Sequence, residues 1–154
     1  MDLPLALAVT AAVLGASGVL GLVLTRRSGR PRAPRDGAPR LRAGDLPGLD
    51  ELGSAATLVQ FSTEYCGGCA PARRQLSAVA TAHDGVALVE IDLTNRGDLA
   101  REHGILTTPT VFLLDADGVL RTRFAGAPRR EDLAAALAEA TAATAPSSSG
   151  SPRP

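Results

Sequence analysis

The chain has 154 residues and a formal net charge of zero, because 16 basic residues, all of them arginine, balance 16 acidic ones. Zero net charge gives no bulk attraction to nucleic acid, and three Phe and one Tyr without Trp are too few aromatic rings for a nucleic-acid platform. Two cysteines are too few for a disulfide-rich secreted scaffold or for a four-ligand zinc site. His83 and His103 could in principle complete such a zinc site, but we expect both to lie in solvent near helix ends. The composition therefore argues against nucleic-acid binding and against a metal site.

The first feature along the chain is an uncharged apolar run over residues 3–24. As a helix that rises about 1.5 Å per residue, it would cover roughly 33 Å, enough for a hydrocarbon core of about 30 Å. A signal peptide carries a basic region before the run and a cleavage site after it, whereas Asp2 precedes this run and Arg26-Arg27 closes it. We therefore predict an uncleaved transmembrane anchor over residues 1–24.

Residues 25–44 are rich in Arg, Pro, Gly and Ala, and we expect them to form a juxtamembrane linker. This stretch holds seven arginines, from Arg26 to Arg42, against a single acid, Asp36. Basic residues beside a span tend to remain in the cytoplasm, so the arginines predict a single-pass cell-membrane protein whose folded domain is cytoplasmic. At the other end of the chain, residues 145–154 lack apolar content and are predicted to be disordered.

Residues 45–144 alternate between strand and helix patterns and are predicted to form one folded domain. Strands are expected over residues 57–62, 86–92, 110–114 and 119–124, and helices over residues 66–83, 95–103 and 129–143. An Asp-Gly turn joins the last two strands into an antiparallel hairpin. This order predicts an α/β fold of three layers, in which helices cover both faces of a mixed central sheet.

The two cysteines, Cys66 and Cys69, form a C-x-x-C where the first strand is expected to pass into the first helix. Unpaired N–H groups and the positive end of the helix dipole both favour a thiolate at that place. The spacing lets the second sulfur reach the first from the same turn. The motif therefore predicts thiol–disulfide exchange by a redox-active pair, with no metal and no organic cofactor.

Over roughly residues 44–144 the chain resembles the thioredoxin superfamily. The resemblance rests on three separated features, which are Glu64-Tyr-Cys-Gly-Gly-Cys69, Thr107-Thr-Pro-Thr110, and the Asp-Gly hairpin followed by Phe124-Ala-Gly126. It implies that Cys66 is the attacking thiolate and Cys69 the resolving thiol. It also implies that Pro109 is cis and lies against the two sulfurs, although Pro109 taken alone could be an ordinary proline at the start of a strand.

The same resemblance implies a substrate groove beside the cysteines, formed by Tyr65, Gly67, Gly68, Thr108, Pro109 and Gly126. In the family, an extended substrate segment pairs with the backbone of the residue that corresponds to Thr108, and a glycine like Gly126 lets that segment approach.

The chain departs from the family pattern at three places. Tyr65 stands where the family usually has Trp, and Gly67-Gly68 stands where it usually has Gly-Pro. Each glycine near a helix start costs up to about 1 kcal/mol relative to alanine, so this pair predicts a looser turn. Gln60 stands where the family usually carries a buried aspartate that assists proton transfer at the second cysteine, and Leu88 takes the place of that aspartate's lysine partner. Glutamine cannot relay a proton, so we expect either a water relay or a slower, specialised exchanger.

These features predict a membrane-anchored thiol–disulfide oxidoreductase that reduces protein disulfides and takes electrons from a thioredoxin-reductase-type system. Membrane-anchored relatives often face outward and reduce apocytochrome or envelope-protein disulfides with electrons from a transmembrane thiol donor, which is the second interpretation. A third is a non-catalytic module that docks peptides at Pro109. The sequence leaves open the substrate, the electron donor, the reduction potential, the oligomeric state and the sidedness.

Overall fold

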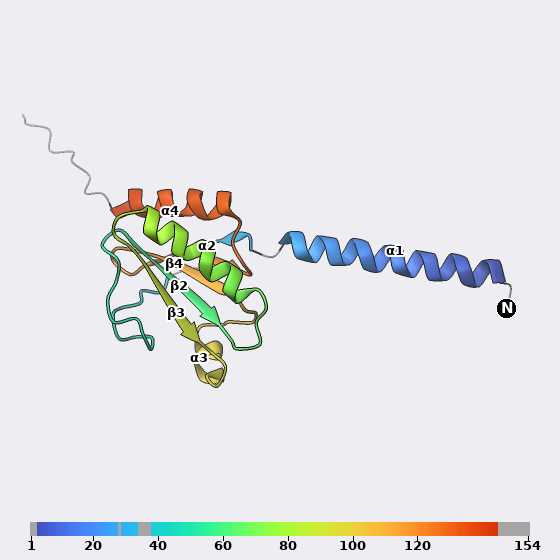
Figure 1. The fold of residues 1–154 in the computed structure, drawn as a ribbon, viewed down its shortest axis with the longest axis horizontal. Helices are drawn as coiled ribbons and strands as arrows, with labels where there is room; N and C mark the ends of the chain where they lie inside the picture. Colours follow the sequence, from blue (N-terminus) through green and yellow to red (C-terminus); the bar gives the residue numbers. More distant parts are fainter. Residues whose placement is uncertain (1–2, 28, 34–37, 145–154) are drawn as a thin grey trace, which may run out of the picture.

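The computed structural model describes residues 3–27, 29–33 and 38–144. It consists of a long N-terminal helix, α1 (Leu3–Arg27), which projects from an α/β domain (Figure 1). The predicted disordered tail, residues 145–154, lies outside the described residues, as do residues 28 and 34–37 of the predicted linker.

The domain is built on one mixed sheet. Its strands are β1 (Pro31–Arg32), β2 (Ala56–Ser62), β3 (Val86–Asp92), β4 (Thr110–Asp115) and β5 (Leu120–Ala125), and its helices are α2 (Cys69–Ala82), α3 (Gly97–Glu102) and α4 (Arg130–Thr144). The five strands are ordered β1-β5-β4-β2-β3, with β2 parallel to β3 and antiparallel to β4. The predicted fold class, a mixed sheet between helical layers, is therefore confirmed.

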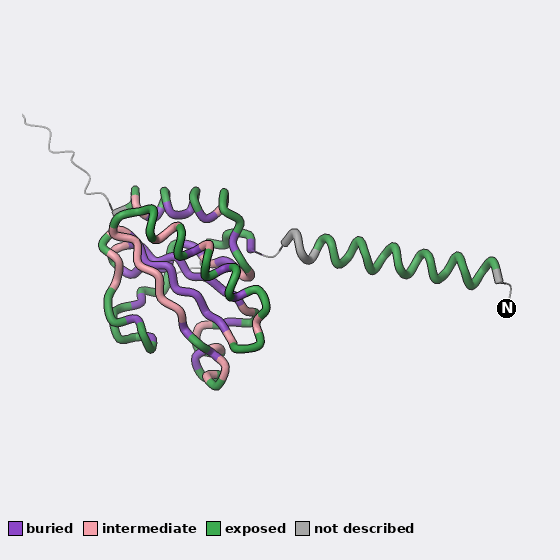
Figure 2. The backbone as a smooth tube through the Cα atoms, in the orientation of Figure 1, coloured by how far each residue is buried: buried purple, intermediate pink, exposed green. Residues whose placement is uncertain are grey.

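Two hydrophobic clusters, one on each face of the sheet, form the core. Under α2 and α4, the buried members include Leu58, Leu76, Val111, Leu113, Phe124, Leu133 and Leu137. The opposite face is covered by α3 and by the loop that precedes β2, and its buried members include Leu41, Leu46, Leu49, Val59, Phe61, Ile91, Leu99 and Phe112. All seven residues of β2 are buried because this central strand is covered on both faces (Figure 2).

Helix α2 begins at Cys69, three residues later than the start predicted at Cys66. Residues 66–69 instead form a turn, in which the amide of Cys69 donates to the carbonyl of Cys66 over 3.1 Å. Gly68 is the N-cap residue, with φ −86° and ψ −12°. The reason is local, since two consecutive glycines pay the largest backbone entropy in a helix and so delay its start.

Part of the segment expected as a linker lies on the domain. Pro31 and Arg32 form the edge strand β1, which pairs antiparallel with β5. Proline is tolerated there because an edge strand leaves one row of its backbone groups unpaired. Leu41 is only 7% exposed and packs into the core, and the neighbouring Arg40 bridges to Val119. Residues before position 45 therefore pair with the sheet and pack into the core of the folded domain.

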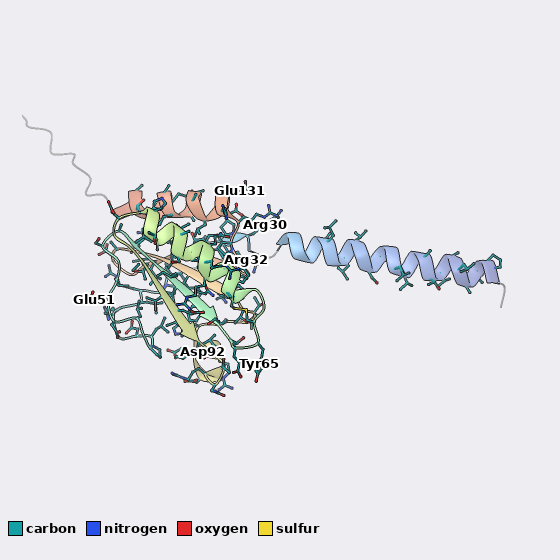
Figure 3. The ribbon with its side chains drawn as sticks, viewed as in Figure 1. Arg30, Arg32, Glu51, Tyr65, Asp92 and Glu131 are labelled. Carbon is teal, nitrogen blue, oxygen red and sulfur yellow. A yellow bond between two sulfur atoms is a disulfide. The ribbon has the colours of Figure 1, made fainter. Side chains whose placement is uncertain are left out.

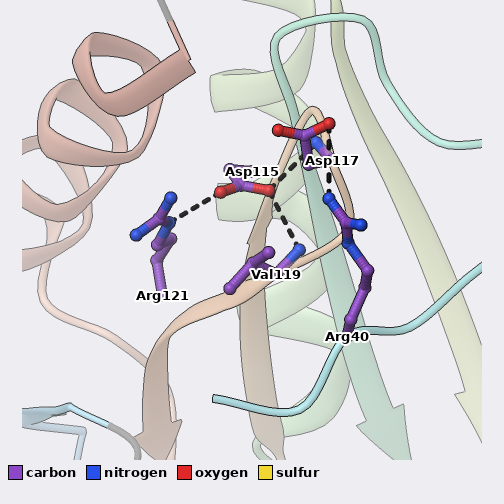
Figure 4. A network of polar contacts seen from close by, with 5 residues as sticks. All are labelled: Arg40, Asp115, Asp117, Val119 and Arg121. Atoms are coloured by element: carbon purple, nitrogen blue, oxygen red, sulfur yellow. Dashed lines mark hydrogen bonds and ion pairs between the residues drawn. The ribbon is translucent and has the colours of Figure 1, made fainter. Parts of the chain in front are cut away.

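The hairpin between β4 and β5 is closed by a buried carboxylate. One oxygen of Asp115 accepts hydrogen bonds from the amides of Asp117 and Val119, over 3.0 and 2.9 Å. The other oxygen accepts from Nε of Arg121 over 2.6 Å (Figure 4). Because the side chain of Asp115 is only 1% exposed, these donors replace the water that the carboxylate loses on folding.

Helix α1 carries no charged side chain before Arg26 and Arg27 at its end. Residues Pro4–Val23 have a mean hydropathy of 2.1, and none of that window is buried in the structure. In length and composition α1 could cross a membrane, and a signal sequence near the N-terminus would have the same properties.

Candidate active site

The two cysteines are joined as a disulfide at the start of α2. The S–S distance is 2.05 Å and the two Cα atoms are 5.4 Å apart. Cys69 is 5% exposed, whereas Cys66 is half-buried. Cys66 is therefore the more accessible residue of the pair.

The turn that carries Cys66 is held to the ends of two strands. The amide of Leu93 donates to the carbonyl of Ser62 over 2.8 Å, which joins the chain beyond β3 to the end of β2. The amide of Glu64 donates to Oγ1 of Thr94 over 2.9 Å, and that hydroxyl donates in turn to Asp92. This relay of hydrogen bonds fixes the loop immediately before the reactive cysteine.

The carboxylate at the end of this relay is stabilised in its ionised form. Asp92 accepts from the hydroxyl and from the amide of Thr94, and these two hydrogen bonds, the hydroxyl's first, lower the pKa of Asp92 below its ordinary value. Asp92 lies at the same end of the sheet as Tyr65, as the side chains labelled in Figure 3 show.

Pro109 lies against the turn that connects the cysteines. The Thr108–Pro109 peptide bond is cis. A Cβ placed on Gly68 would lie 3.5 Å from Cδ of Pro109, so the proline ring is in van der Waals range of this glycine. The hydroxyls of Thr63 and Thr108 are 3.3 Å apart and share a hydrogen bond across the same place.

Gly126 is tied to the opposite side of the proline. Its amide donates to the carbonyl of Pro109 over 2.8 Å, and its φ of +100° lies in the region that side-chain-bearing residues rarely adopt. The structure thus brings together Gly68, Thr108, Pro109 and Gly126, which are members of the predicted groove. Gly67 lies in the exposed turn, where a Cβ would meet no atom within 4 Å.

Two large side chains of the loops around the site are open to solvent. Tyr65 is 88% exposed and immediately precedes Cys66. Leu106 is 96% exposed and lies in the loop that leads to Pro109. Leu106 was not among the predicted site residues, although it stands directly before the Thr107-Thr-Pro-Thr110 segment.

Gln60 contacts Cys69, the first residue of α2, from the central strand β2. It is fully buried on β2, and its Nε2 donates to the carbonyl of Cys69 over 3.0 Å, while its Oε1 has no hydrogen-bond partner. A neutral amide therefore occupies the interior next to the pair, at the position where the sequence analysis had expected the proton relay to be altered.

A charged pair that was not predicted from the sequence lies one helical turn beyond Cys69. Glu90 is the register neighbour of Gln60 on β3, and its carboxylate is 3.1 Å from the guanidinium of Arg73 on α2. Glu90 interrupts a largely apolar strand in the sequence, but no spacing links it to Arg73, because β3 and α2 come together only in the fold.

Comparison with known proteins places this site in a family. The thioredoxin family profile matches residues 50–139, more than half of the chain. The chain therefore belongs to the thioredoxin family. Protein disulfide isomerase-like 1-3 of Arabidopsis thaliana is 40% identical over 70 residues, which are 45% of this chain and 12% of that protein.

A second relative and a solved structure agree with this assignment. A putative protein disulfide-isomerase of Schizosaccharomyces pombe is 34% identical over 89 residues, covering 55% of this chain and 18% of that protein. The chain thus spans less than a fifth of either relative's length. The structure of thioredoxin-2 of the malaria parasite matches with a TM-score of 0.50 at 20% identity, over 55% of this chain and 82% of that one, which supports the fold alone.

Family membership, similarity to disulfide isomerases and a C-x-x-C pair that forms a disulfide together support one class of chemistry at this site, thiol–disulfide exchange.

Proposed function

We propose that this protein is a membrane-anchored oxidoreductase that reduces protein disulfides with the dithiol of Cys66 and Cys69. The observation that carries the proposal is the asymmetry of the pair, in which the half-buried Cys66 precedes α2 and the buried Cys69 begins it. The pair itself is the redox group, so the proposed reaction takes no other cofactor.

The first step is the attack of the Cys66 thiolate on a sulfur of the target disulfide. A mixed disulfide forms between Cys66 and that sulfur, and the second target sulfur leaves as a thiolate. The N–H groups at the start of α2 favour the thiolate, and a pKa near 7 instead of about 8.5 would raise its fraction at neutral pH from a few per cent to about half. The lower basicity reduces its intrinsic nucleophilicity in part.

The second step closes the pair. Cys69 loses its proton and attacks the Cys66 sulfur, the Cys66–Cys69 disulfide forms, and the first target sulfur leaves as a thiolate that takes up a proton. Two electrons pass from the dithiol to the target. The amide of Gln60 cannot ionise, so we propose that water takes the proton of Cys69, while the hydrogen bond from Gln60 to the Cys69 carbonyl holds that residue in place.

The extended segment of the substrate would lie in the groove formed by Thr108, Pro109 and Gly126, with Tyr65 and Leu106 as exposed apolar contacts at its sides. Large exposed apolar side chains in the loops of a reactive centre are suited to bind partly unfolded or extended protein segments.

We propose further that α1 anchors the domain in the cell membrane as a single span. The arginines that follow it, from Arg26 to Arg42, favour a cytoplasmic domain that a thioredoxin-reductase-type system supplies with electrons. An outward-facing domain, fed by a transmembrane thiol donor, is the alternative that a protease-accessibility experiment on sealed vesicles would identify.

Reduction of insulin disulfides by the full chain in detergent micelles, with dithiothreitol as the electron source, tests the proposal. We expect Cys66→Ser to abolish turnover and Cys69→Ser to accumulate mixed disulfides that are visible on non-reducing gels. Ser77→Ala, an exposed change on α2, serves as the matched control and should keep full activity. Full activity in the Cys66→Ser protein would rule the mechanism out, whereas a wild-type protein that does not reduce insulin would indicate a non-catalytic peptide-binding groove.

A further inference from the structure

Helix α1 is joined to the folded domain by a very short connection. Only one residue separates Arg27, the last residue of α1, from Gly29, which already lies on the sheet. The amide of Gly29 donates to the carbonyl of Ala125 over 2.6 Å, and the strand β1 that follows pairs with β5. The segment that the sequence predicts as a linker is therefore fastened to the domain immediately after α1.

The point of attachment is the loop that also borders the substrate groove. Gly29 has a φ of +76°, and a Cβ at this position would overlap the carbonyl oxygen of Ala127. Both the backbone conformation and the close approach require glycine. The neighbouring Gly126 donates to the carbonyl of Pro109 over 2.8 Å, and Pro109 lies against Gly68 between the two cysteines. A short series of direct contacts thus connects the end of α1 to the reactive pair.

These contacts limit the distance between the reactive pair and the membrane. The apolar window of α1 ends at Val23, about 6 Å along the helix before Arg27, and the connection to Gly29 adds at most about 7 Å. The path from Gly29 to Cys66 crosses two strand spacings of about 4.8 Å and a few residues of chain, about 25 Å in all. Cys66 therefore stays within about 40 Å of the hydrocarbon at any tilt of the domain, whereas a free linker over residues 25–44 would alone span up to about 70 Å.

The active site also lies on the side of the domain from which α1 leaves. Figure 3 places Tyr65, the neighbour of Cys66, on the same side of the domain as Arg30 and Arg32, whereas Glu51 lies on the far side. Arg30 and Arg32 are exposed. Exposed arginines beside a membrane span attract anionic lipid headgroups by roughly 1 kcal/mol each, which favours a domain whose active-site side is held towards the bilayer.

We propose that the disulfides reduced at this site belong to other membrane proteins and lie close to the bilayer surface. The inference rests on the proposed function and on α1 as a membrane span. An anchored enzyme and an anchored target meet in one thin layer, which raises the effective concentration of the target disulfide at the site. The chemistry is that of the proposed function, in which two electrons and two protons pass from the dithiol of Cys66 and Cys69 to the target. The target disulfide becomes two thiols, and the pair closes as a disulfide.

Two designed target proteins test the proposal. Each is a single apolar span that continues into a stiff helical spacer and carries one disulfide-closed loop, about 15 Å from the hydrocarbon in the near target and about 60 Å in the far target. Each target is reconstituted with the full chain in vesicles of phosphatidylcholine and phosphatidylglycerol, with dithiothreitol as the electron source, and the freed thiols are measured by alkylation. The rate with the Cys66→Ser protein is subtracted, which removes direct reduction by dithiothreitol. We expect the near target to be reduced at least about tenfold faster than the far one.

Two insertions of equal length separate the effect of the connection from other effects. About twenty glycine and serine residues inserted directly after Arg27 lengthen the connection, and they should raise the rate on the far target at least about fivefold. The same insert between Arg32 and Pro39 is the matched control, because β1 still holds the domain next to α1, and it should leave the wild-type preference unchanged. Both variants should reduce insulin in detergent micelles like wild type, which shows that they fold and that exchange is intact.

A wild-type protein that reduces insulin but reduces both targets at the same rate would overturn the inference and leave the proposed function standing. Equal effects of the two insertions would overturn it as well, because the docking of β1 would then not set the reach of the site. A wild-type protein that reduces neither insulin nor either target would contradict the proposed function and the inference together.

Discussion

At the scale of single residues, the chemistry of the pair depends on what touches Cys69. The side chain of Gln60 is buried, donates to the Cys69 carbonyl, and leaves its own Oε1 without a partner. Because an amide does not titrate, we expect the rate of disulfide reduction between about pH 5 and 9 to follow one ionisation, that of Cys66.

Gln60→Asp should change that profile. A carboxyl group introduced at this buried position would have a raised pKa, so a second inflection should appear in the pH–rate curve. Gln60→Asn is the matched control, because it has the same shape as the aspartate and cannot ionise, and its curve should keep a single inflection. Identical curves for the two variants would show that ionisation of a side chain at position 60 does not affect the rate of disulfide reduction by the two cysteines.

Asp98, in the first turn of α3, offers a second test at this scale. Hydrogen bonds from the Arg96 guanidinium lower the pKa of Asp98 to about 2. A depressed pKa stabilises the fold above the ordinary aspartate range, and this contribution is lost as the pH falls through about 2. We expect Arg96→Gln to return the pKa towards 3.8 in a carboxyl-carbon NMR titration, and Arg101→Gln to leave it unchanged.

At the scale of elements, the hairpin of β4 and β5 depends on Asp115. Asp115→Ala would leave the partly buried amides of Asp117 and Val119 without their acceptor and would release Arg121 (Figure 4). We expect the free energy of unfolding to fall by about 2–3 kcal/mol in urea titrations followed by circular dichroism.

The matched control for that change is Asp117→Ala. Asp117 forms an ion pair with Arg40 over 3.4 Å, and the two side chains are 67% and 49% exposed. An exposed pair contributes little, so we expect a loss of at most about 1 kcal/mol. Equal losses in the two variants would contradict the structural role assigned to Asp115.

Elements with a strong pattern could be predicted from the sequence, and elements set by local backbone chemistry could not. The apolar run Val86–Asp92 gave the bounds of β3, and the Asp-Gly turn gave the hairpin. The start of α2 was wrong by three residues, because the thiol spacing suggested a helix where Gly67 and Gly68 favour a turn. Strand β1 was missed, because a pair of residues carries no periodicity and its pairing depends on β5.

The site was predictable to the same extent. The motifs identified Cys66, Cys69 and Pro109, whose cis peptide bond the structure contains. The contact between Gln60 and the Cys69 carbonyl and the ion pair of Arg73 with Glu90 both connect elements that only the folded sheet brings together. Such contacts leave no spacing in the sequence from which they could be predicted.

At the scale of the whole molecule, the central question is whether α1 remains attached. The apolar stretch Pro4–Val23 is long enough for a membrane span, and Arg26 and Arg27 follow it. We expect the protein purified from membranes to have the intact mass of the full chain, with residues 1–24 present. A mature protein that begins after α1 would show that this segment is a signal sequence and would contradict the proposal that α1 anchors the domain in the membrane.

The direction of electron flow between the protein and its substrate is also a property of the whole molecule. A reductase needs a pair that gives up its electrons readily, whereas an oxidant or isomerase needs a pair that holds them. The reduction potential of the Cys66–Cys69 couple is therefore the most direct measurement. It can be made on the full chain in detergent, equilibrated in glutathione buffers and followed by thiol alkylation and mass spectrometry.

For a reductase we expect a reversible two-electron couple near about −270 mV, with a tenfold change in the ratio of oxidised to reduced protein for about 30 mV. A potential between about −180 and −120 mV would contradict the reductase and indicate an oxidant or isomerase. A pair that does not cycle at all would contradict exchange chemistry altogether and leave a peptide-binding domain.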